Sequence, residues 1–411
     1  MHYVIIGNGG AGVSALQAIR RIDTKSNVTI ISIEKYPAYS PCSLPNLLSG
    51  EIDESNIFRF DKHFYHRQNV KFIKNIEVIQ ILPGDKKVKL VNNKSVQYDK
   101  LLIATGAKPI VPKGIKGLGL DGVHIMGTLD STLEILANIK KGVKHAVVLG
   151  GGFMGIETAI MLTKRGIEVS VVEILPNILS RMLDQDMSEN VAEILKEHGI
   201  NLVLNDKLKS INGGKNVTDV SLKENILHCD MVVIAIGVKP NTIILKGSGI
   251  KVNQGVIVDL KMKTNINDIY AAGDITEVKE QIEGIQGSFA IWPNAIEQGR
   301  IAGLNMAGES TTYNGAEVVN VLDVFNIPVV ALGRTSRDLG KYKVISRFTP
   351  DAFKKILLKN NKIVGLQFIN TIRNTGTFYS LMKNGTDISN IEDRLLDDNF
   401  LISPEIINTK I

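Results

Sequence analysis

The sequence predicts an α/β protein with two parallel sheets, followed by a smaller α+β segment. Two stretches repeat one order of elements: an apolar strand, a glycine-rich turn, a helix and a second apolar strand, spanning about 30 residues each. They cover residues 3–34 and 146–173. Their strands are continuous apolar runs, typical of parallel strands buried on both faces. Residues 316–411 instead contain short strands and a helix near residues 377–383, and we expect them to form a separate α+β domain.

The composition of the 411-residue chain excludes several classes of protein. Cys42 and Cys229 are the only cysteines, too few for a disulfide scaffold or a four-cysteine metal site, so we expect no bound metal. The formal net charge is +6, but the lysines and arginines are scattered, so we expect no nucleic-acid partner. The chain starts with a strand and has no apolar run of about 18 residues. We therefore expect a cytoplasmic protein with no membrane partner.

The first glycine turn has the features of a dinucleotide-binding site. Gly7, Gly9 and Gly12 form a GxGxxG pattern between a strand and a helix. The first glycine permits a tight turn, the second lets the backbone approach a pyrophosphate, and the third lets the helix pack closely on the strand. Glu34 ends the second strand, where a carboxylate can accept hydrogen bonds from ribose hydroxyls. The residues expected to bind the dinucleotide here are Gly7, Gly9, Gly10, Ala11, Gly12, Glu34 and Lys35.

The second glycine turn repeats this pattern. Gly150, Gly152 and Gly155 precede a helix, and Glu173 ends the following strand. A carboxylate suits a free ribose 2′-OH and repels a 2′-phosphate, so NADH is favoured, with NADPH as the alternative. Two such turns, each in a full βαβ context, predict two Rossmann-like domains. The expected contacts are Gly150, Gly152, Phe153, Met154, Gly155, Glu173 and Gly237.

The order of the later motifs resembles the pyridine nucleotide–disulfide oxidoreductase superfamily, flavoproteins with two dinucleotide-binding domains. The motifs are ATG at residues 104–106, AIG at residues 235–237 and YAAGD at residues 270–274. The resemblance implies that the first turn binds FAD and the second binds NADH. The implied domains are an FAD-binding domain of residues 1–110 and 240–315, an NAD(P)H-binding domain of residues 111–239, and a C-terminal interface or dimerisation domain of residues 316–411.

The resemblance also implies further FAD contacts. It places Asp274 at the ribityl chain, whereas a helix cap or turn is the alternative for this residue. It makes Trp292 the start of a helix whose N-terminus points at the flavin pyrimidine ring, where reduced flavin carries negative charge. The other residues implied to bind FAD are Ser40, Pro41, Ala104, Thr105, Gly106, Gly273, Pro293, Asn294 and Ala295.

One cysteine, Cys42, stands where two-cysteine disulfide reductases carry a pair. The segment resembles the single-cysteine branch, which includes NADH oxidases, NADH peroxidases and coenzyme A–disulfide reductases. In that branch the cysteine faces the flavin and cycles through a sulfenic acid or a mixed disulfide. Close to oxidised flavin and a helix N-terminus it would be a thiolate nucleophile. A small buried hydrophobe is the alternative for Cys42 and the favoured interpretation of Cys229.

Several residues differ from the usual pattern of this branch, and these differences reduce the number of possible electron acceptors. Ser43 replaces its usual glycine, and Asn46 replaces the tyrosine of coenzyme A–disulfide reductases. The first glycine turn has no histidine, which argues against a peroxidase. Disulfides, persulfides and dioxygen therefore stay open as acceptors. In the implied mechanism Phe153 gates the flavin face, with a core aromatic as the alternative, and Glu157 orients the nicotinamide amide.

Residues 363–381 resemble the C-terminal domain of NADH–rubredoxin reductases and nitrite-reductase flavin domains. An alternative function is therefore electron transfer to rubredoxin or a partner redox subunit, in which Cys42 is dispensable. A second alternative is a non-catalytic flavin-binding, redox-sensing subunit. In the oxidase and disulfide-reductase branch the last domain forms a homodimer. Tyr379 would then contribute to the other subunit's active site, and core packing is its alternative role.

Overall fold

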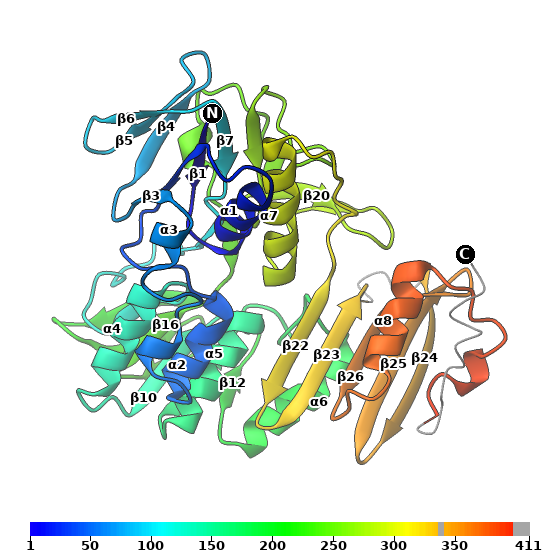
Figure 1. The fold of residues 1–411 in the computed structure, drawn as a ribbon. Helices are drawn as coiled ribbons and strands as arrows, with labels where there is room; N and C mark the ends of the chain where they lie inside the picture. The colour runs from blue at the N-terminus through cyan, green and yellow to red at the C-terminus, as the bar shows by residue number, and fades with distance from the viewer. Residues whose placement is uncertain (336–340, 398–411) are drawn as a thin grey trace. The chain divides into compact units, whose positions relative to one another are not determined.

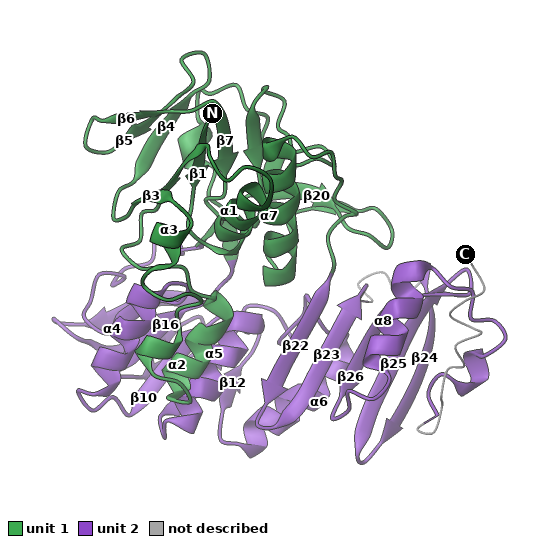
Figure 2. Cartoon of the chain, viewed as in Figure 1, with its two compact units in different colours: residues 1–108, 238–317 green, residues 109–237, 318–411 purple. Residues whose placement is uncertain are grey.

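The structure, a computed structural model, describes residues 1–335 and 341–397 and divides into two compact units (Figure 2). Unit 1 comprises residues 1–108 and 238–317, and unit 2 comprises residues 109–237 and 318–411. The end of the expected C-terminal domain, residues 398–411, lies outside the described residues. No helix within the described ranges has both the length and the apolar character that crossing a bilayer requires.

Unit 1 contains the first repeated stretch and a series of short strands (Figure 1). Its elements are β1 (His2–Ile6), α1 (Gly10–Ile22), β2 (Asn27–Ile31), η1 (Pro41–Ser43), α2 (Leu44–Ser49), η2 (Glu54–Asn56), α3 (Phe64–Arg67), β3 (Val70–Ile73), β4 (Val78–Leu82), β5 (Lys87–Leu90), β6 (Ser95–Gln97), β7 (Lys100–Ile103), β8 (Ala107–Pro109), β17 (Val238–Pro240), η3 (Ile243–Leu245), β18 (Val256–Ile257), β19 (Ile269–Ala271), β20 (Thr276–Lys279), β21 (Gln286–Gly287) and α7 (Trp292–Ala307).

The core of unit 1 is a five-stranded parallel sheet with the strand order β19-β7-β1-β2-β3. The central strand β1 is apolar on both faces, and Val4 and Ile5 are completely buried. Helices α1 and α7 cover one face, and the antiparallel sheet β4-β5-β6 packs on the other. The continuous apolar run of β1 is therefore explained by burial on both sides.

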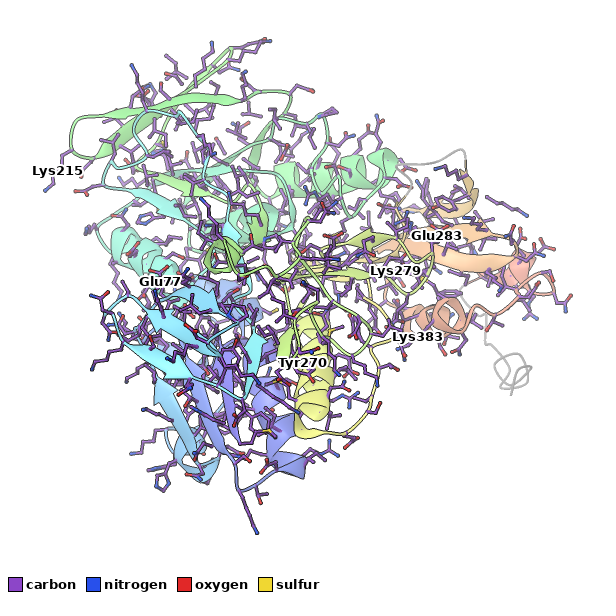
Figure 3. All side chains as sticks on the ribbon, turned by 90° about the horizontal axis from the view of Figure 1, so that it is seen from above. Glu77, Lys215, Tyr270, Lys279, Glu283 and Lys383 are labelled. Carbon is purple, nitrogen blue, oxygen red and sulfur yellow. The ribbon has the colours of Figure 1, made fainter. Side chains whose placement is uncertain are left out.

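Helices α1 and α7 lie side by side and approach closely through small residues (Figure 1). A Cβ at Gly299 would lie 2.2 Å from the carbonyl oxygen of Ala11, and one at Gly303 would lie 2.4 Å from that of Ala15. Tyr270 of β19, labelled in Figure 3, donates a hydrogen bond to a carbonyl of α7 at 3.4 Å. Because the two helices pack this closely, the N-terminus of α7 reaches the N-terminus of α1.

Unit 2 contains the second repeated stretch and the C-terminal strands. Its elements are β9 (Val123–Ile125), α4 (Leu129–Ile139), β10 (His145–Leu149), α5 (Phe153–Lys164), β11 (Glu168–Val172), α6 (Gln185–Glu197), β12 (Asn201–Val203), β13 (Leu208–Gly213), β14 (Val217–Leu222), β15 (Ile226–His228), β16 (Met231–Ile234), β22 (Val319–Val324), β23 (Ile327–Gly333), β24 (Lys343–Thr349), β25 (Ala352–Lys359), β26 (Lys362–Ile369), α8 (Thr375–Asn384) and η5 (Glu392–Arg394).

Unit 2 contains the three-stranded antiparallel sheet β13-β14-β15 and two five-stranded sheets. The first five-stranded sheet is parallel, with the order β12-β11-β10-β16-β9, and carries the second glycine turn. The second is antiparallel, with the order β22-β23-β26-β25-β24. Helix α8 packs on it, and the rings of Phe378 and Phe368 meet edge to face at 5.8 Å. The mixed α/β fold expected from the sequence is confirmed, and the last segment has the strands and the helix that the sequence predicted.

Buried polar contacts join the antiparallel sheet to α6. Lys355 of β25 lies 3.3 Å from a carboxylate oxygen of Asp184 and also contacts Asp186. Its neighbour Gln367 accepts a hydrogen bond from the Asp184 amide at 2.8 Å. The side chains of Lys355 and Asp184 are only 6% and 4% exposed. Residues 318–397 therefore belong to the same compact unit as residues 109–237. The separate C-terminal domain expected from the sequence stays a prediction.

Replacing Lys355 by methionine should strongly destabilise unit 2. The change removes the Lys355 ammonium from the buried Asp184 carboxylate, and breaking such a buried pair costs about 3 kcal/mol. Lys223→Met is the matched control, because it removes an exposed ion pair with Glu224 and should leave the unfolding temperature unchanged. Differential scanning calorimetry compares the two variants. Equal unfolding temperatures would show that the buried pair contributes nothing.

Candidate functional site

In the first glycine turn the outer glycines lie against backbone atoms, whereas the middle glycine has free space beside it. Gly7 has φ +115°, and a Cβ at Gly12 would lie 2.1 Å from the Gly7 carbonyl oxygen. A Cβ at Gly9, in contrast, would meet no atom within 4 Å. Gly9 is the N-cap of α1 and has no side chain, so the first N–H groups of α1 are left for a ligand. This cradle fits a pyrophosphate.

The second glycine turn has the same geometry in unit 2. Gly150 has φ +109°, and a Cβ at Gly155 would lie 1.8 Å from the Gly150 carbonyl oxygen. A Cβ at Gly152 would meet nothing within 4 Å. Phe153 and Met154, the half-buried first residues of α5, follow this open position directly. The two turns therefore share one geometry, in which the outer glycines are crowded and the exposed middle glycine leaves room for a phosphate.

The carboxylates of Glu173 and Glu34 are held differently. Glu173 directly follows β11, as expected, whereas β2 ends at Ile31 and Glu34 lies in the bend beyond it, so the prediction that Glu34 ends the strand is wrong. Glu173 accepts hydrogen bonds from the amides of Gly151 at 2.6 Å and Leu175 at 2.9 Å, so backbone contacts fix it on the second turn. Glu34 accepts a hydrogen bond from the Tyr39 hydroxyl at 2.7 Å. A fixed negative charge beside the second turn favours ribose hydroxyls and disfavours an added phosphate.

Cys42 lies in the short turn η1, which runs directly into α2. Its side chain is exposed, so the buried-hydrophobe alternative does not hold for this residue. Cys229 is only 3% exposed, and burial raises the pKa of its thiol to about 12. The segment before Cys42 is tied to the first glycine turn, because the Asn8 side chain donates to the Tyr36 carbonyl at 3.3 Å. The chain therefore presents one accessible thiol, in the same unit as the first turn.

The ATG turn packs directly on the first glycine turn. A Cβ at Gly7 would lie 2.0 Å from the carbonyl oxygen of Ala104. The Thr105 hydroxyl donates to the Asn241 carbonyl at 3.1 Å, and the Asn241 amide donates to the Gly106 carbonyl at 2.9 Å. The structure thus uses Thr105 to join two distant segments of unit 1.

The start of α7 lies beside the start of α1. A Cβ at Gly10 would lie 2.9 Å from the Trp292 ring, which also stacks with the guanidinium of Arg59 at 5.3 Å. Asn294 has a structural role, because its amide donates to and accepts from the backbone of Glu317 at 2.9 Å. Two helix N-termini, each with a positive dipole end, therefore converge in unit 1.

Two carboxyl groups near these turns have raised pKa values. Burial raises the pKa of Asp274, which follows β19 and Gly273, to about 6. Burial alone raises the pKa of Glu157, one turn into α5, to about 7. Carboxyl groups of this kind are candidates for ligand contact, because a ligand hydroxyl or amide can replace the lost solvent.

The other predicted residues divide between the units as follows. Unit 1 contains Ala11 and Ala295, which are buried between α1 and α7, together with Ser40, Pro41, Lys35 and Pro293, and unit 2 contains Gly237, which has φ +108°. Gly151 and Tyr39 contact the predicted residues Glu173 and Glu34, and Asn8 holds the segment before Cys42, although the sequence did not point to these contacts. Asn8 and Gly151 could have been found from their places inside the two glycine motifs.

Comparisons with known proteins agree with this geometry. A family model described as pyridine nucleotide-disulphide oxidoreductase matches residues 1–299. The chain belongs to this family. It is therefore an oxidoreductase of the FAD- and NAD(H)-dependent type, and the resemblance inferred from the motif order is confirmed.

Three relatives illustrate the range of this family. An NADH oxidase from Methanocaldococcus jannaschii is 32% identical over 392 residues, which is 90% of this chain and 87% of that protein. An NADH-rubredoxin oxidoreductase from Clostridium acetobutylicum is 29% identical over 88% of both chains. The structure of an NAD-dependent persulfide reductase from A. fulgidus superposes with a TM-score of 0.91 at 26% identity, over 98% of this chain and 80% of that one.

Alanine should affect FAD binding at the open glycine, Gly9, and stability at the crowded glycine, Gly12. Gly9 has φ −80°, so Gly9→Ala should fold normally but fill the cradle and abolish FAD binding. Gly12→Ala places a methyl group against a carbonyl oxygen and should destabilise the fold by about 3 kcal/mol. Visible absorbance after reconstitution with FAD and thermal unfolding measure the two effects. A yellow, fully loaded Gly9→Ala protein would be incompatible with this assignment.

The raised pKa of Glu157 predicts a pH-dependent stability. Between its ordinary pKa of 4.5 and about 7, the folded protein holds a proton that the unfolded chain releases. Stability should therefore fall as pH rises through this window. Glu157→Gln removes this loss, so without nucleotide the variant should exceed the wild type by roughly 3 kcal/mol at about pH 8 and match it at about pH 4.5. Urea unfolding at both pH values tests this, and parallel pH profiles would contradict it.

Proposed function

We propose that this chain is an NADH-dependent flavoenzyme that reduces a small disulfide or persulfide through Cys42. The observation that carries this proposal is the exposed thiol of Cys42, whose segment is hydrogen-bonded to the first glycine turn. A redox-active thiol must be accessible to its substrate and close to the electron source. The persulfide reductase relative supports the same substrate class.

Unit 1 is the proposed FAD-binding unit. The α1 N-terminus at Gly9 and Gly10 would hold the pyrophosphate, Glu34 the adenosine ribose and Asp274 the ribityl hydroxyls. The N-terminus of α7 at Trp292 would face the flavin pyrimidine ring and stabilise negative charge there. When bound, FAD supplies the chemistry that protein side chains lack, namely acceptance of a hydride and transfer of two electrons.

Residues 109–237 are the proposed NADH-binding part of unit 2. The α5 N-terminus at Gly152 would hold the pyrophosphate and Glu173 the adenosine ribose, with NADH preferred over NADPH. Glu157, with a pKa of about 7, is partly protonated at neutral pH and can donate a hydrogen bond to the nicotinamide amide. We propose that Phe153 moves aside when nicotinamide enters. Residues 318–411 are the proposed interface of a homodimer.

The chemistry of Cys42 follows from thiol–disulfide exchange. The Cys42 thiolate attacks one sulfur of the substrate disulfide, which forms a mixed disulfide and releases the first thiolate. Two electrons that originate from NADH then cleave the mixed disulfide, release the second thiolate and restore Cys42. Protons from solvent complete the products, so that NADH, one proton and one disulfide give NAD⁺ and two thiols. Such thiol chemistry fits a cytoplasmic location.

Dioxygen and electron-carrier proteins are the other acceptors to consider. The NADH oxidase relative favours dioxygen, and the NADH-rubredoxin oxidoreductase relative, which matches over 88% of both chains, favours a one-electron carrier. In the carrier function Cys42 is not needed. A redox-sensing subunit without turnover would bind the cofactors but oxidise NADH only at the background rate.

Cys42→Ser separates these functions. NADH should still bleach the bound flavin in this variant, whereas reduction of coenzyme A disulfide or polysulfide should fall at least about 100-fold, because serine cannot form the mixed disulfide. Cys229→Ser is the control, since it removes the other thiol from the core and should keep disulfide reduction. Stopped-flow absorbance and an acceptor series with oxygen, disulfide, polysulfide and rubredoxin provide the readouts. Unchanged disulfide reduction in Cys42→Ser would refute the thiol mechanism.

A further inference from the structure

A single tyrosine hydroxyl joins the first glycine turn to the segment that leads to Cys42. Tyr65 of α3 donates to the side-chain oxygen of Asn8, inside the turn, at 2.7 Å. The same hydroxyl accepts a hydrogen bond from the Ala38 amide at 3.0 Å. Asn8 uses its side-chain nitrogen for the Tyr36 carbonyl at 3.3 Å. Asn8 and Tyr65 thus hold the segment of residues 36–38 at two backbone positions.

Aromatic packing fixes the position of this hydroxyl. The ring of Tyr65 stacks on Phe72 of β3 at 4.4 Å and meets Phe64 edge to face at 5.2 Å. Phe64 in turn stacks on Phe60 at 3.9 Å. Such contacts leave the ring little freedom, so the hydroxyl cannot follow the glycine turn if the turn moves. Any displacement of Asn8 must therefore break a hydrogen bond or pass to the segment of residues 36–38.

Burial makes these hydrogen bonds costly to lose. Asn8 and Ala38 are 8% and 3% exposed. Burial also raises the pKa of Tyr65, so its hydroxyl stays protonated and can donate. If the hydroxyl is removed, the Ala38 amide and the Asn8 oxygen lose a partner in a place that water reaches poorly. The hydroxyl thus has a larger effect than a surface contact would have.

We propose that Tyr65 is a positioning residue that couples FAD binding at the first glycine turn to the reactivity of Cys42. Bound pyrophosphate fixes the turn, Asn8 and Tyr65 fix residues 36–38, and Cys42 follows four residues later. This inference rests on the proposed function, because it requires that unit 1 binds FAD. By reciprocity, modification of Cys42 must change FAD affinity by the same factor by which FAD changes the binding equilibrium at Cys42.

The test uses Tyr65→Phe in the full-length protein, with two readouts that need no turnover. The first is the dissociation constant of FAD, followed by its fluorescence, which we expect to rise about tenfold when two buried hydrogen bonds are lost. The second is the ratio of the rates at which an alkylating reagent labels Cys42 with and without FAD. We expect this ratio to move towards one in the variant. Cys229 is buried and serves as an internal reference for labelling.

Tyr98→Phe is the matched control. Tyr98 is a buried tyrosine of the same unit, and within the described residues its hydroxyl has no hydrogen-bond partner. This variant should keep both the FAD affinity and the labelling ratio of the wild type. Asn8→Ala should also lower the FAD affinity and move the labelling ratio towards one. The double variant should lose less affinity than the sum of the two single losses, because both single changes break the same Tyr65–Asn8 hydrogen bond.

The outcomes distinguish the inference from the proposed function. If the wild type binds no FAD, the proposed function is wrong. If the wild type binds FAD but Tyr65→Phe and Tyr98→Phe retain the same labelling ratio, the coupling through Tyr65 is wrong, even where affinity falls. Thermal unfolding of the FAD-free variants checks that they fold. If Tyr65→Phe does not fold, the same two readouts are measured on Asn8→Ala.

Discussion

The fold depends on two backbone contacts in which the start of a helix touches the end of a strand. Gly12 lies against the carbonyl of Gly7 in unit 1, and Gly155 lies against that of Gly150 in unit 2, with no room for a side-chain carbon at either glycine. Each contact places the helix N-terminus at the carboxyl end of the central strand. The free N–H groups of both helices are thereby aimed at an open position, and a phosphate can bind where the backbone itself is the ligand.

In unit 1 a similar close backbone contact joins α1 to α7. The small residues of α1 and α7 let the two helices pack backbone to backbone, as at Ala11 and Gly299, which brings Trp292 next to Gly10. Two dipole ends then share one region, where peptide groups favour negative charge. The guanidinium of Arg59, 5.3 Å from the centre of the Trp292 ring, adds a positive group beside it.

Unit 2 shows how a second sheet can be attached by polar contacts. The Lys355–Asp184 pair and Gln367 are buried, and removing one partner of such a pair would leave a buried charge without compensation. A shift of the sheet along α6 would separate these partners, so the contacts disfavour other positions of the sheet. The ring of His198 on Phe325, with centroids 4.1 Å apart, adds a second fixed point between α6 and the sheet.

Local rules of the chain were enough to predict the α/β class, both glycine turns, the acid that follows β11 and the helix near residues 377–383, observed as α8. These features depend on neighbouring residues, namely backbone freedom at glycine and the period of apolar side chains. Only the tertiary structure decided that Cys42 is exposed while Cys229 is buried, and that Tyr65 reaches Asn8 across 57 positions. It also placed the C-terminal sheet with α6. These outcomes depend on the paths of loops, and no short sequence pattern specifies which distant side chains such paths bring together.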